Sequence, residues 1–351
     1  MEPDSTTYES TSSGKSSDEI YVPFTTCPGN FNFFKELVTN NGKKSLVCQI
    51  IQRLQDFGLL ATSVRCPSGQ PDCNVVCRQA RVIDRVQWVC EGCGKRQPIR
   101  IGSFFYRLQC SILQTLQLIL AWCEDADLNY AVQHFDVKPK VANCIFEKLD
   151  DLAIRELRRD KLGGENAVVL AEMYPDCLNR LSPDTTDQPH VHRILMLADT
   201  KHIPTNYRFH VIREDSKLLG FGGETYFLKT QVEEAVSSLV EPGSVVVTGN
   251  SVPSVEGTWS LQQLQQYCDV DMQHFLSSRI WSQAVVLCGA SRELCAGATG
   301  GACALHAQRY LHAALYRLRT AGDGFFRHVL TLIAAEFTCS DEKIASVVTS
   351  D

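Results

Sequence analysis

The chain has 351 residues, of which 44% are hydrophobic and 21% are charged, and its formal net charge is −6. This length allows two or three domains, and the composition is typical of a soluble globular protein. The acidic balance excludes a uniformly basic nucleic-acid-binding protein, although local basic patches remain compatible with it. The longest apolar run, around residues 116–122, is far shorter than a membrane span of roughly 18 residues, so we expect no membrane association.

The first part of the chain divides into a polar tail and a helical segment. Residues 1–20 are rich in Ser, Thr, Asp and Glu and lack an apolar core segment, which predicts a disordered tail and no secretory signal. From residue 32 to residue 60 the apolar residues recur at helical spacing, with a break near residues 40–42. This pattern predicts two short helices.

The chain contains sixteen cysteines, which in the absence of a secretory signal indicate metal ligands and buried thiols rather than disulfides. Cys90 and Cys93 form a Cys-x-x-Cys turn, whose two thiolates can reach one tetrahedral ion. The upstream half is irregular, because Gly69 stands where a Cys-Pro-x-Cys turn would have its second cysteine. The candidates for the remaining ligands are Cys66, Cys73 and Cys77. We therefore predict a structural zinc site in a β-rich ribbon over residues 66–105, with a metal-free β-knuckle as the alternative.

Basic residues are concentrated around the same motif. Residues 78–107 contain seven basic and two acidic residues, which gives a local charge of +5 within an acidic chain. Because the cluster overlaps the cysteine motif, it favours contact with phosphates over a merely solvated surface. The candidate DNA-contacting residues of this segment are Lys95, Arg96 and Arg100.

A helix-turn-helix is predicted after the ribbon. Three segments have helical periodicity: 112–122, 128–135 and 141–158. Pro139 suits the first turn of the last helix. Three candidate DNA-contacting residues lie at the start of that helix, where recognition helices meet base edges or phosphates: Lys138, Lys140 and Asn143. Glu147, Asp150 and Asp151 follow, and we expect them to repel the DNA backbone.

From residue 166 the pattern changes to an α/β arrangement. Four short apolar runs predict strands: 167–171, 193–200, 207–212 and 244–248. A helix is predicted over residues 232–239, and strands alternating with a helix indicate an α/β domain. Beyond residue 280 the chain is largely helical, with a basic and aromatic face that we interpret as mostly solvated, formed by Arg309, Tyr310, Tyr316, Arg317, Arg319 and Arg327.

Several motifs follow one another in order along residues 88–172. They are Trp88-Val89-Cys90, then Pro-Ile-Arg-Ile-Gly-Ser-Phe-Phe over residues 98–105, an apolar helix ending in aromatics, the helix-turn-helix, and a Leu-Gly-Gly turn at 162–164. This series resembles the Merlin superfamily of cut-and-paste DNA transposases, which are related to bacterial insertion-sequence transposases. The resemblance weakens after about residue 258. It implies a zinc ribbon and a helix-turn-helix joined to an RNase H-like catalytic domain.

Such a domain cuts DNA with carboxylates that hold two divalent metal ions. The resemblance places these acids at Ala171, Gly249 and, three residues before Trp281, Ser278. Neutral side chains do not replace carboxylates as ligands of hard cations, so we expect no enzyme activity and no catalytic magnesium. Glu172 follows the first position and therefore points to the opposite face of its strand, so it is not expected to rebuild the site.

Together these observations predict a mixed α+β or α/β protein. The expected divisions are a disordered tail (1–20), N-terminal helices with a zinc-ribbon-like module (30–107), a helix-turn-helix region (108–160), an RNase H-like domain (165–280) and a C-terminal helical region (281–351). The leading hypothesis is a catalytically inactive, transposase-derived nuclear protein that binds DNA or chromatin and scaffolds nuclear protein partners, with homodimerisation open and no small-molecule substrate. The alternatives are a protein-interaction module without DNA binding, an active metal-dependent transposase, and a cytoplasmic location.

Overall fold

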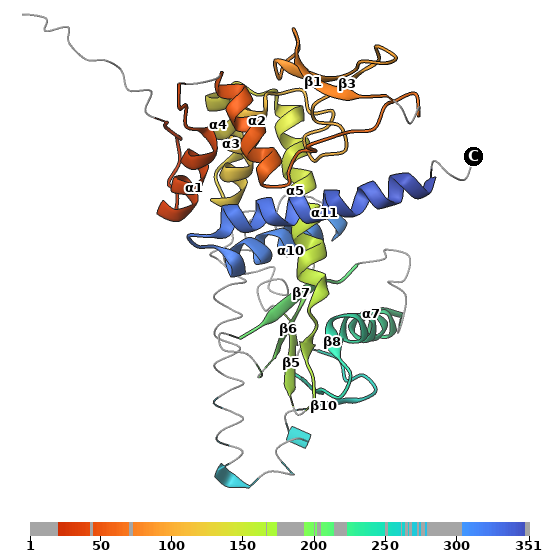
Figure 1. The fold of residues 1–351 in the computed structure, drawn as a ribbon. Helices are drawn as coiled ribbons and strands as arrows, with labels where there is room; N and C mark the ends of the chain where they lie inside the picture. Colours follow the sequence, from red (N-terminus) through yellow and green to blue (C-terminus); the bar gives the residue numbers. More distant parts are fainter. Residues whose placement is uncertain are drawn as a thin grey trace, which may run out of the picture. The chain divides into compact units, whose positions relative to one another are not determined.

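The computed structural model describes residues 20–42, 45–69, 73–165, 167–173, 193–199, 201, 205–213, 223–249, 252–260, 262–263, 266, 269–271, 274, 278 and 304–347. Residues 1–19 of the predicted tail and Trp281 lie outside this set. The chain divides into two compact units, Met1–Ala142 with Gly322–Asp351, and Asn143–Ala321. The described residues form eight helices and three sheets, so the mixed α/β class is confirmed (Figure 1).

The first unit contains a helical core. Its helices are α1 (Pro28–Val38), α2 (Leu46–Asp56), α3 (Ile112–Cys123), α4 (Leu128–Phe135) and α11 (Phe325–Val347). Ser45 and Ser111 cap α2 and α3, and Gln114 completes a capping box on α3. Phe34, Leu54 and Trp122 are almost fully buried. The two short helices expected over residues 32–60 are thus confirmed as α1 and α2, because their apolar faces pack on each other and on α3.

Asn30 ties three helices of this unit together. Its side-chain amide donates to Oε1 of Glu124 at 2.8 Å, just after α3, and its amide oxygen accepts from the backbone N–H of Phe326 at 3.0 Å in α11. The sequence grouped residues 281–351 as one region, whereas α11 belongs to the first unit and α10 (Ala304–Thr320) to the second. Gly322 lies between the two helices and has a φ of 149°, a conformation that residues with a side chain rarely adopt.

A small antiparallel sheet belongs to the same unit. Its strands are β1 (Val75–Gln79), β2 (Val86–Cys90) and β3 (Arg96–Pro98), with β2 in the centre. Along β2, Val86, Trp88 and Cys90 are buried while the residues between them are partly exposed, which is the alternation of a half-buried strand. The β-rich module predicted over residues 66–105 is therefore present.

A sharp turn separates α4 from the long helix α5 (Pro139–Arg159). Asp136 ends α4 in the left-handed conformation, and the N–H of Val137 returns to the carbonyl of Val132. Pro139 opens α5, as expected for a residue without a backbone N–H to donate. Two helices with a short turn between them are thus present over these residues, whereas a helix-turn-helix domain and its use on DNA stay predictions.

The second unit is built on a five-stranded sheet. In the order β10-β9-β5-β6-β7 its strands are β10 (Thr258–Ser260), β9 (Val245–Thr248), β5 (Val168–Met173), β6 (Ile194–Asp199) and β7 (Tyr207–Val211). β5, β6 and β7 pair antiparallel, while β9 and β10 run parallel to β5. A short parallel pair, β4 (Leu162–Gly163) and β8 (Val240–Glu241), accompanies this sheet. The four predicted strands correspond to β5, β6, β7 and β9.

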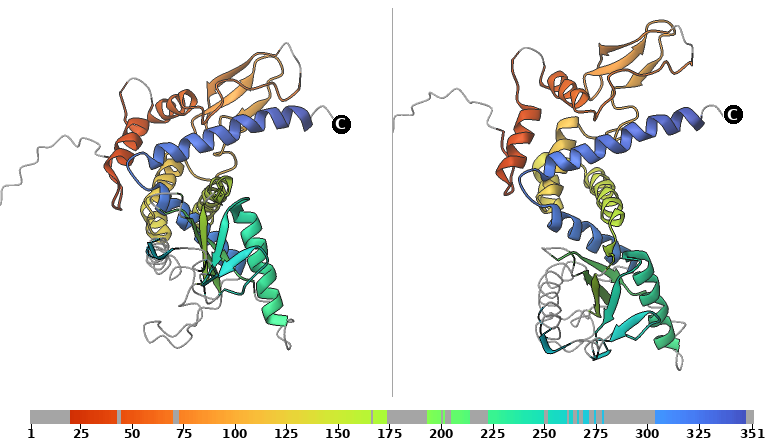
Figure 2. Two further views of the ribbon diagram at one scale, coloured as in Figure 1. Left: turned by 90° about the horizontal axis from the view of Figure 1, so that it is seen from below. Right: turned by 60° about the horizontal axis from the view of Figure 1, so that its bottom comes forward.

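Helix α7 (Gly223–Leu239) supplies one side of the core of this unit (Figure 2). Its Val232 and Ala235 belong to one buried cluster with Ala171 of β5, Leu197 of β6 and Val246 of β9. At the β7 edge of the sheet, the side chain of Gln308 in α10 accepts from the N–H of Val211 at 2.6 Å and donates to the carbonyl of Phe209 at 2.9 Å. These bonds satisfy backbone groups that an edge strand would otherwise leave open.

Candidate metal centre and nucleic-acid interface

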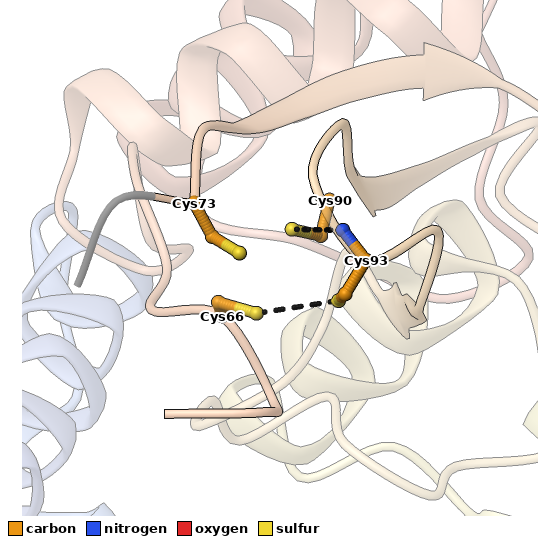
Figure 3. A group of neighbouring side chains, drawn as sticks. All are labelled: Cys66, Cys73, Cys90 and Cys93. Carbon is orange, nitrogen blue, oxygen red and sulfur yellow. Dashed lines mark hydrogen bonds between the residues drawn. The ribbon is translucent and has the colours of Figure 1, made fainter. Parts of the chain in front are cut away.

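Four cysteines converge beside the small sheet of the first unit (Figure 3). The sulfur atoms of Cys66, Cys73, Cys90 and Cys93 all lie within 4.8 Å of one another, and the Sγ atoms of Cys66 and Cys93 are 3.4 Å apart. Ligands at about 2.3 Å from a tetrahedral zinc ion lie roughly 3.8 Å from each other, which fits this spacing. The group can therefore bind a metal such as zinc.

Two tight turns carry three of these thiols, those of Cys66, Cys90 and Cys93. In the first, the N–H of Ser68 donates to the Sγ of Cys66 at 3.3 Å, and the N–H of Gly69 donates to the Cys66 carbonyl. In the second, the N–H of Cys93 donates to the Sγ of Cys90 at 3.4 Å. Such N–H groups stabilise thiolates, the form that binds metals.

One glycine in each turn helps to bring the thiols together. Gly69 has a φ of 68°, so the position that the sequence suggested as a lost cysteine meets a conformational demand of the turn. A Cβ on Gly92 would lie 3.0 Å from the Sγ of Cys73, so the missing side chain lets Cys73 approach the second turn. Cys73 thus completes the set from outside the regular Cys-x-x-Cys pattern.

The thiols differ in their acidity. Hydrogen bonding to Ser68 and to the backbone of Lys95 lowers the pKa of the Cys93 thiol to about 6. Hydrogen bonds with Cys90 and Cys66 raise the pKa of Cys73 to about 12. A divalent cation among the four sulfurs favours their deprotonation, as expected for thiolate ligands.

Cys77, the other upstream candidate, is not part of the group. It lies on β1 opposite Trp88 and is exposed. Among the residues that the structure describes, the four converging cysteines are the only set of three or more His, Cys, Asp or Glu side chains close enough to hold an ion. Of the upstream candidates that the sequence left open, Cys66 and Cys73 thus lie close enough to Cys90 and Cys93 to share an ion with them.

This assignment predicts the metal content of cysteine variants. We expect the full chain to carry about one zinc equivalent when measured by elemental analysis. Cys73→Ser should reduce this to less than half an equivalent, because only three thiolates remain. Cys77→Ser, which changes a cysteine in the same module, should leave it unchanged. Equal losses in both variants, or a wild-type chain without zinc, would contradict the four-cysteine site.

The predicted DNA-contacting residues of the ribbon separate into two groups. Lys95 and Arg96 are exposed at the start of β3. Arg100, in contrast, is buried: its guanidinium binds both carboxylate oxygens of Asp84 and donates to the carbonyl of Leu108 at 3.1 Å. These three bonds occupy Arg100 inside the module, which removes it from the residues that we propose to meet DNA.

The local charge of the ribbon persists in the folded module. The two acids of residues 78–107 both pair with arginines, Asp84 with Arg100 and Glu91 with Arg78. Five further basic residues of this segment are exposed: Arg81, Arg85, Lys95, Arg96 and Arg107. In the described part of the chain none of these five has an acidic partner, so their charge is available to an external anion.

The predicted recognition helix begins with exposed polar residues. Lys138, Lys140 and Asn143 are all exposed at the start of α5. Further along the helix, Asp150 and Asp151 pair with Arg317 at 3.5 Å and Arg309 at 2.5 Å, both on α10. Two of the three acids that we expected to repel DNA therefore pair with two arginines of the face that we interpreted as solvated, whereas Glu147 stays exposed and contributes only its carbonyl to Arg309.

Two of the three positions that the resemblance gives to catalytic acids lie on or beside neighbouring strands, Ala171 within β5 and Gly249 just after β9. Ala171 of β5 pairs with Thr248 of β9, and the N–H of Gly249 donates to the Ala171 carbonyl at 2.9 Å. Ala171 is fully buried among apolar side chains, including Val252 and Val255 from the segment after β9. Ser278 is exposed, and its companion Trp281 lies outside the described residues.

The Glu172 carboxylate occupies the space beside Gly249. A Cβ on Gly249 would lie 1.6 Å from Oε2 of Glu172, so this carboxylate takes the volume that a side chain at position 249 would fill. Oε1 of Glu172 accepts from the N–H of Met173 at 3.0 Å. Glu172 and Ala171 thus serve opposite faces of β5, as the strand alternation predicts.

The sequence analysis did not identify the loop between β1 and β2 as a candidate contact site. This loop carries Arg81 and Arg85 around two exposed aliphatic residues, Val82 and Ile83. The available signal was the contrast between adjacent β-branched residues and the polar composition usual for loops. The partnership of Asp84 and Arg100, sixteen positions apart, gave no signal in the sequence.

Comparisons with protein families, with curated proteins and with solved structures found no match to this chain. None of the helices in the described residues is both long enough and apolar enough to cross a membrane.

Proposed function

We propose that this protein is a zinc-ribbon DNA-binding protein derived from a transposase of the Merlin type, with its cutting centre lost. One observation carries the DNA-binding part: both acids of residues 78–107 are paired with arginines within the module, while five basic residues of this segment stay exposed. A polyanion such as duplex DNA complements such a surface, and release of its counterions favours the complex. The proposal extends to chromatin, whose DNA offers the same phosphates, and to a location in the nucleus.

The five-stranded sheet supports an RNase H-like ancestry for the second unit. Three antiparallel strands followed by two parallel ones, in the order β7-β6-β5-β9-β10, form the arrangement expected of that fold. Positions 171 and 249 lie where β5 and β9 run side by side, but a side chain at 249 would lie on the Glu172 face of the sheet, opposite to the face of Ala171. The alanine and glycine there support the loss of catalysis, because neither supplies an oxygen ligand from its side chain.

A salt-titrated binding experiment tests the DNA-binding proposal. We expect the full chain to bind a 30-base-pair duplex with an affinity that falls steeply as salt increases. Lys95→Ala with Arg96→Ala should reduce the slope of log K against log salt by about 2, since each phosphate contact contributes about 0.9. Arg78→Ala, which removes an arginine already paired with Glu91, should change the slope little and serves as the matched control.

Two outcomes of this experiment, and one of a separate cleavage assay, would contradict parts of the proposal. Absence of binding to any duplex at low salt would favour the alternative, a protein-interaction module. In that case protein partners should co-purify with the chain, and the exposed Tyr226 and Trp259 of the second unit are suitable anchors for them. Sedimentation of the same sample would report a homodimer. Equal slopes for the control and the double variant would remove Lys95 and Arg96 from the interface. Strand cleavage that depends on Mg²⁺ or Mn²⁺ would overturn the loss of catalysis.

A further inference from the structure

The loop between β1 and β2 presents an unusual combination of side chains. The N–H of Ala80 donates to the carbonyl of Arg85 at 2.9 Å, and the N–H of Arg85 donates to that of Val82, which closes a tight hairpin. At its tip the side chains of Val82 and Ile83 are 43% and 56% exposed. Loop tips normally carry small polar residues, so two adjacent exposed aliphatic side chains suggest a contact surface.

The charge of this loop is arranged around that apolar tip. Arg81 and Arg85 flank it, and both are exposed. The only acid of the loop, Asp84, turns inward, where its side chain is 6% exposed and binds Arg100. The tip therefore offers cations and aliphatic groups to its surroundings and no negative charge.

The geometry of the hairpin suits a groove of duplex DNA. β3 pairs with β2 as far as Gln87, so beyond it the β1–β2 hairpin continues only as the pair of Gln79 with Val86 and the loop of residues 80–85. Only this narrow two-stranded tip would have to enter a groove. Arg81 and Arg85 lie at the loop end of the ribbon. Lys95 and Arg96 lie at the other end, since Arg96 pairs with Val89 next to the cysteine turn. Basic residues thus mark both ends of the ribbon, which favours an extended anion over a small one.

We propose that this loop inserts into a groove of duplex DNA, with Val82 and Ile83 as an apolar wedge against the bases and Arg81 and Arg85 on the flanking phosphates. The proposal rests on the DNA binding proposed above and names the contacting element. Apolar side chains inserted between base steps unstack them and bend the duplex, whereas arginines beside them hold the backbone. The wedge therefore predicts bending as well as affinity.

Two double variants of the full chain separate these roles. Val82→Ser with Ile83→Ser removes the apolar wedge and keeps the charge, while Arg81→Ala with Arg85→Ala removes the charge and keeps the wedge. Affinity is measured on a 30-base-pair duplex from low to high salt, and bending is measured by energy transfer between dyes at the two duplex ends. Zinc content verifies that each variant retains its ribbon.

We expect the serine variant to bind about tenfold more weakly at every salt concentration, with an unchanged slope and an unbent duplex. The arginine variant should lose about 2 from the slope. If wild type binds and bends DNA and the serine variant does the same, the wedge is wrong while DNA binding stands. If wild type binds no duplex, the proposed function fails first. Loss of binding to vesicles of anionic lipid in the serine variant, with DNA binding intact, would instead assign the loop to a membrane surface and overturn the inference.

Discussion

Replacing Ala171 with aspartate, which restores the first acid that the resemblance implies, should destabilise the second unit by about 3–5 kcal/mol without restoring DNA cleavage. Ala171 is completely buried, and its neighbours in the core include Leu197, Val232 and Val252. A carboxylate there would lose its hydration and find no cation within the apolar cluster. The apolar core of this unit thus occupies the face to which an aspartate at position 171 would point.

The pH dependence of this variant separates buried charge from simple overpacking. Burial raises the pKa of an aspartate above its ordinary value of about 3.9, so the folded state holds the proton more tightly than the unfolded state. The part of the stability loss that comes from the charge is therefore small near pH 4 and grows as pH rises from the unfolded-state pKa towards the raised pKa of the folded state. Ala171→Asn, of the same shape but never charged, should show no such pH dependence.

Hydrogen exchange of the amides in β5 and β9 measures the effect within the second unit, which a single unfolding midpoint of a chain with two units does not. The expected result is faster exchange in the aspartate variant than in the asparagine variant at pH 7.5, and convergence of the two near pH 4. Equal protection of both variants at pH 7.5 would show that position 171 tolerates a charge, and the apolar closure of the site would then be wrong.

Restoring the second acid meets a different obstacle. A side chain at position 249 would collide with the Glu172 carboxylate, which would have to swing away and lose its bond from the N–H of Met173. The displaced carboxylate is the end of a flexible side chain, so this change is less costly than burying a charge at Ala171. The two positions have therefore diverged in different ways: one is filled by the apolar core and the other by a neighbouring carboxylate.

The sequence predicted those parts of the fold whose signal is local. β5, β6, β7 and β9 are runs of four to six residues rich in apolar side chains, and their hydrophobic pattern alone locates them. β10 and the pair of β4 with β8 contain only two or three residues each, which is too short for a periodic pattern. β10 forms because the longer β9 offers it backbone partners, and β4 and β8 form by pairing with each other across the chain, which no local propensity reports.

The candidate metal site was predictable in kind but not in full membership. The Cys-x-x-Cys turn identified Cys90 and Cys93, because both ligands belong to one local motif. Choosing Cys73 over Cys77 required the folded chain: Cys73 reaches the site past Gly92, while Cys77 sits on β1 and is exposed. In the same way, Asp151 and Arg309 are 158 positions apart, so the sequence showed an acidic and a basic surface where the structure has an ion pair.

The ribbon offers a direct comparison between a buried and an exposed ion pair. Asp84→Ala should destabilise the module by about 3–5 kcal/mol, because it leaves the Arg100 guanidinium buried without its partner. Glu91→Ala also removes an acid paired with an arginine, but the side chains of Glu91 and Arg78 are 41% and 60% exposed, so water replaces the lost contact. We expect little change in that control, measured by hydrogen exchange of β1, β2 and β3 and by zinc content.

A double variant distinguishes loss of the ion pair from loss of packing. Asp84→Leu combined with Arg100→Met replaces both charges with apolar groups, and it should recover much of the stability that Asp84→Ala loses, since no buried charge is left without a partner. The bond from Arg100 to the Leu108 carbonyl is lost in this variant, so recovery should be incomplete. If Asp84→Ala and Glu91→Ala are equally stable, the buried pair does not hold the β1–β2 loop, and the inward turn of Asp84 needs another cause.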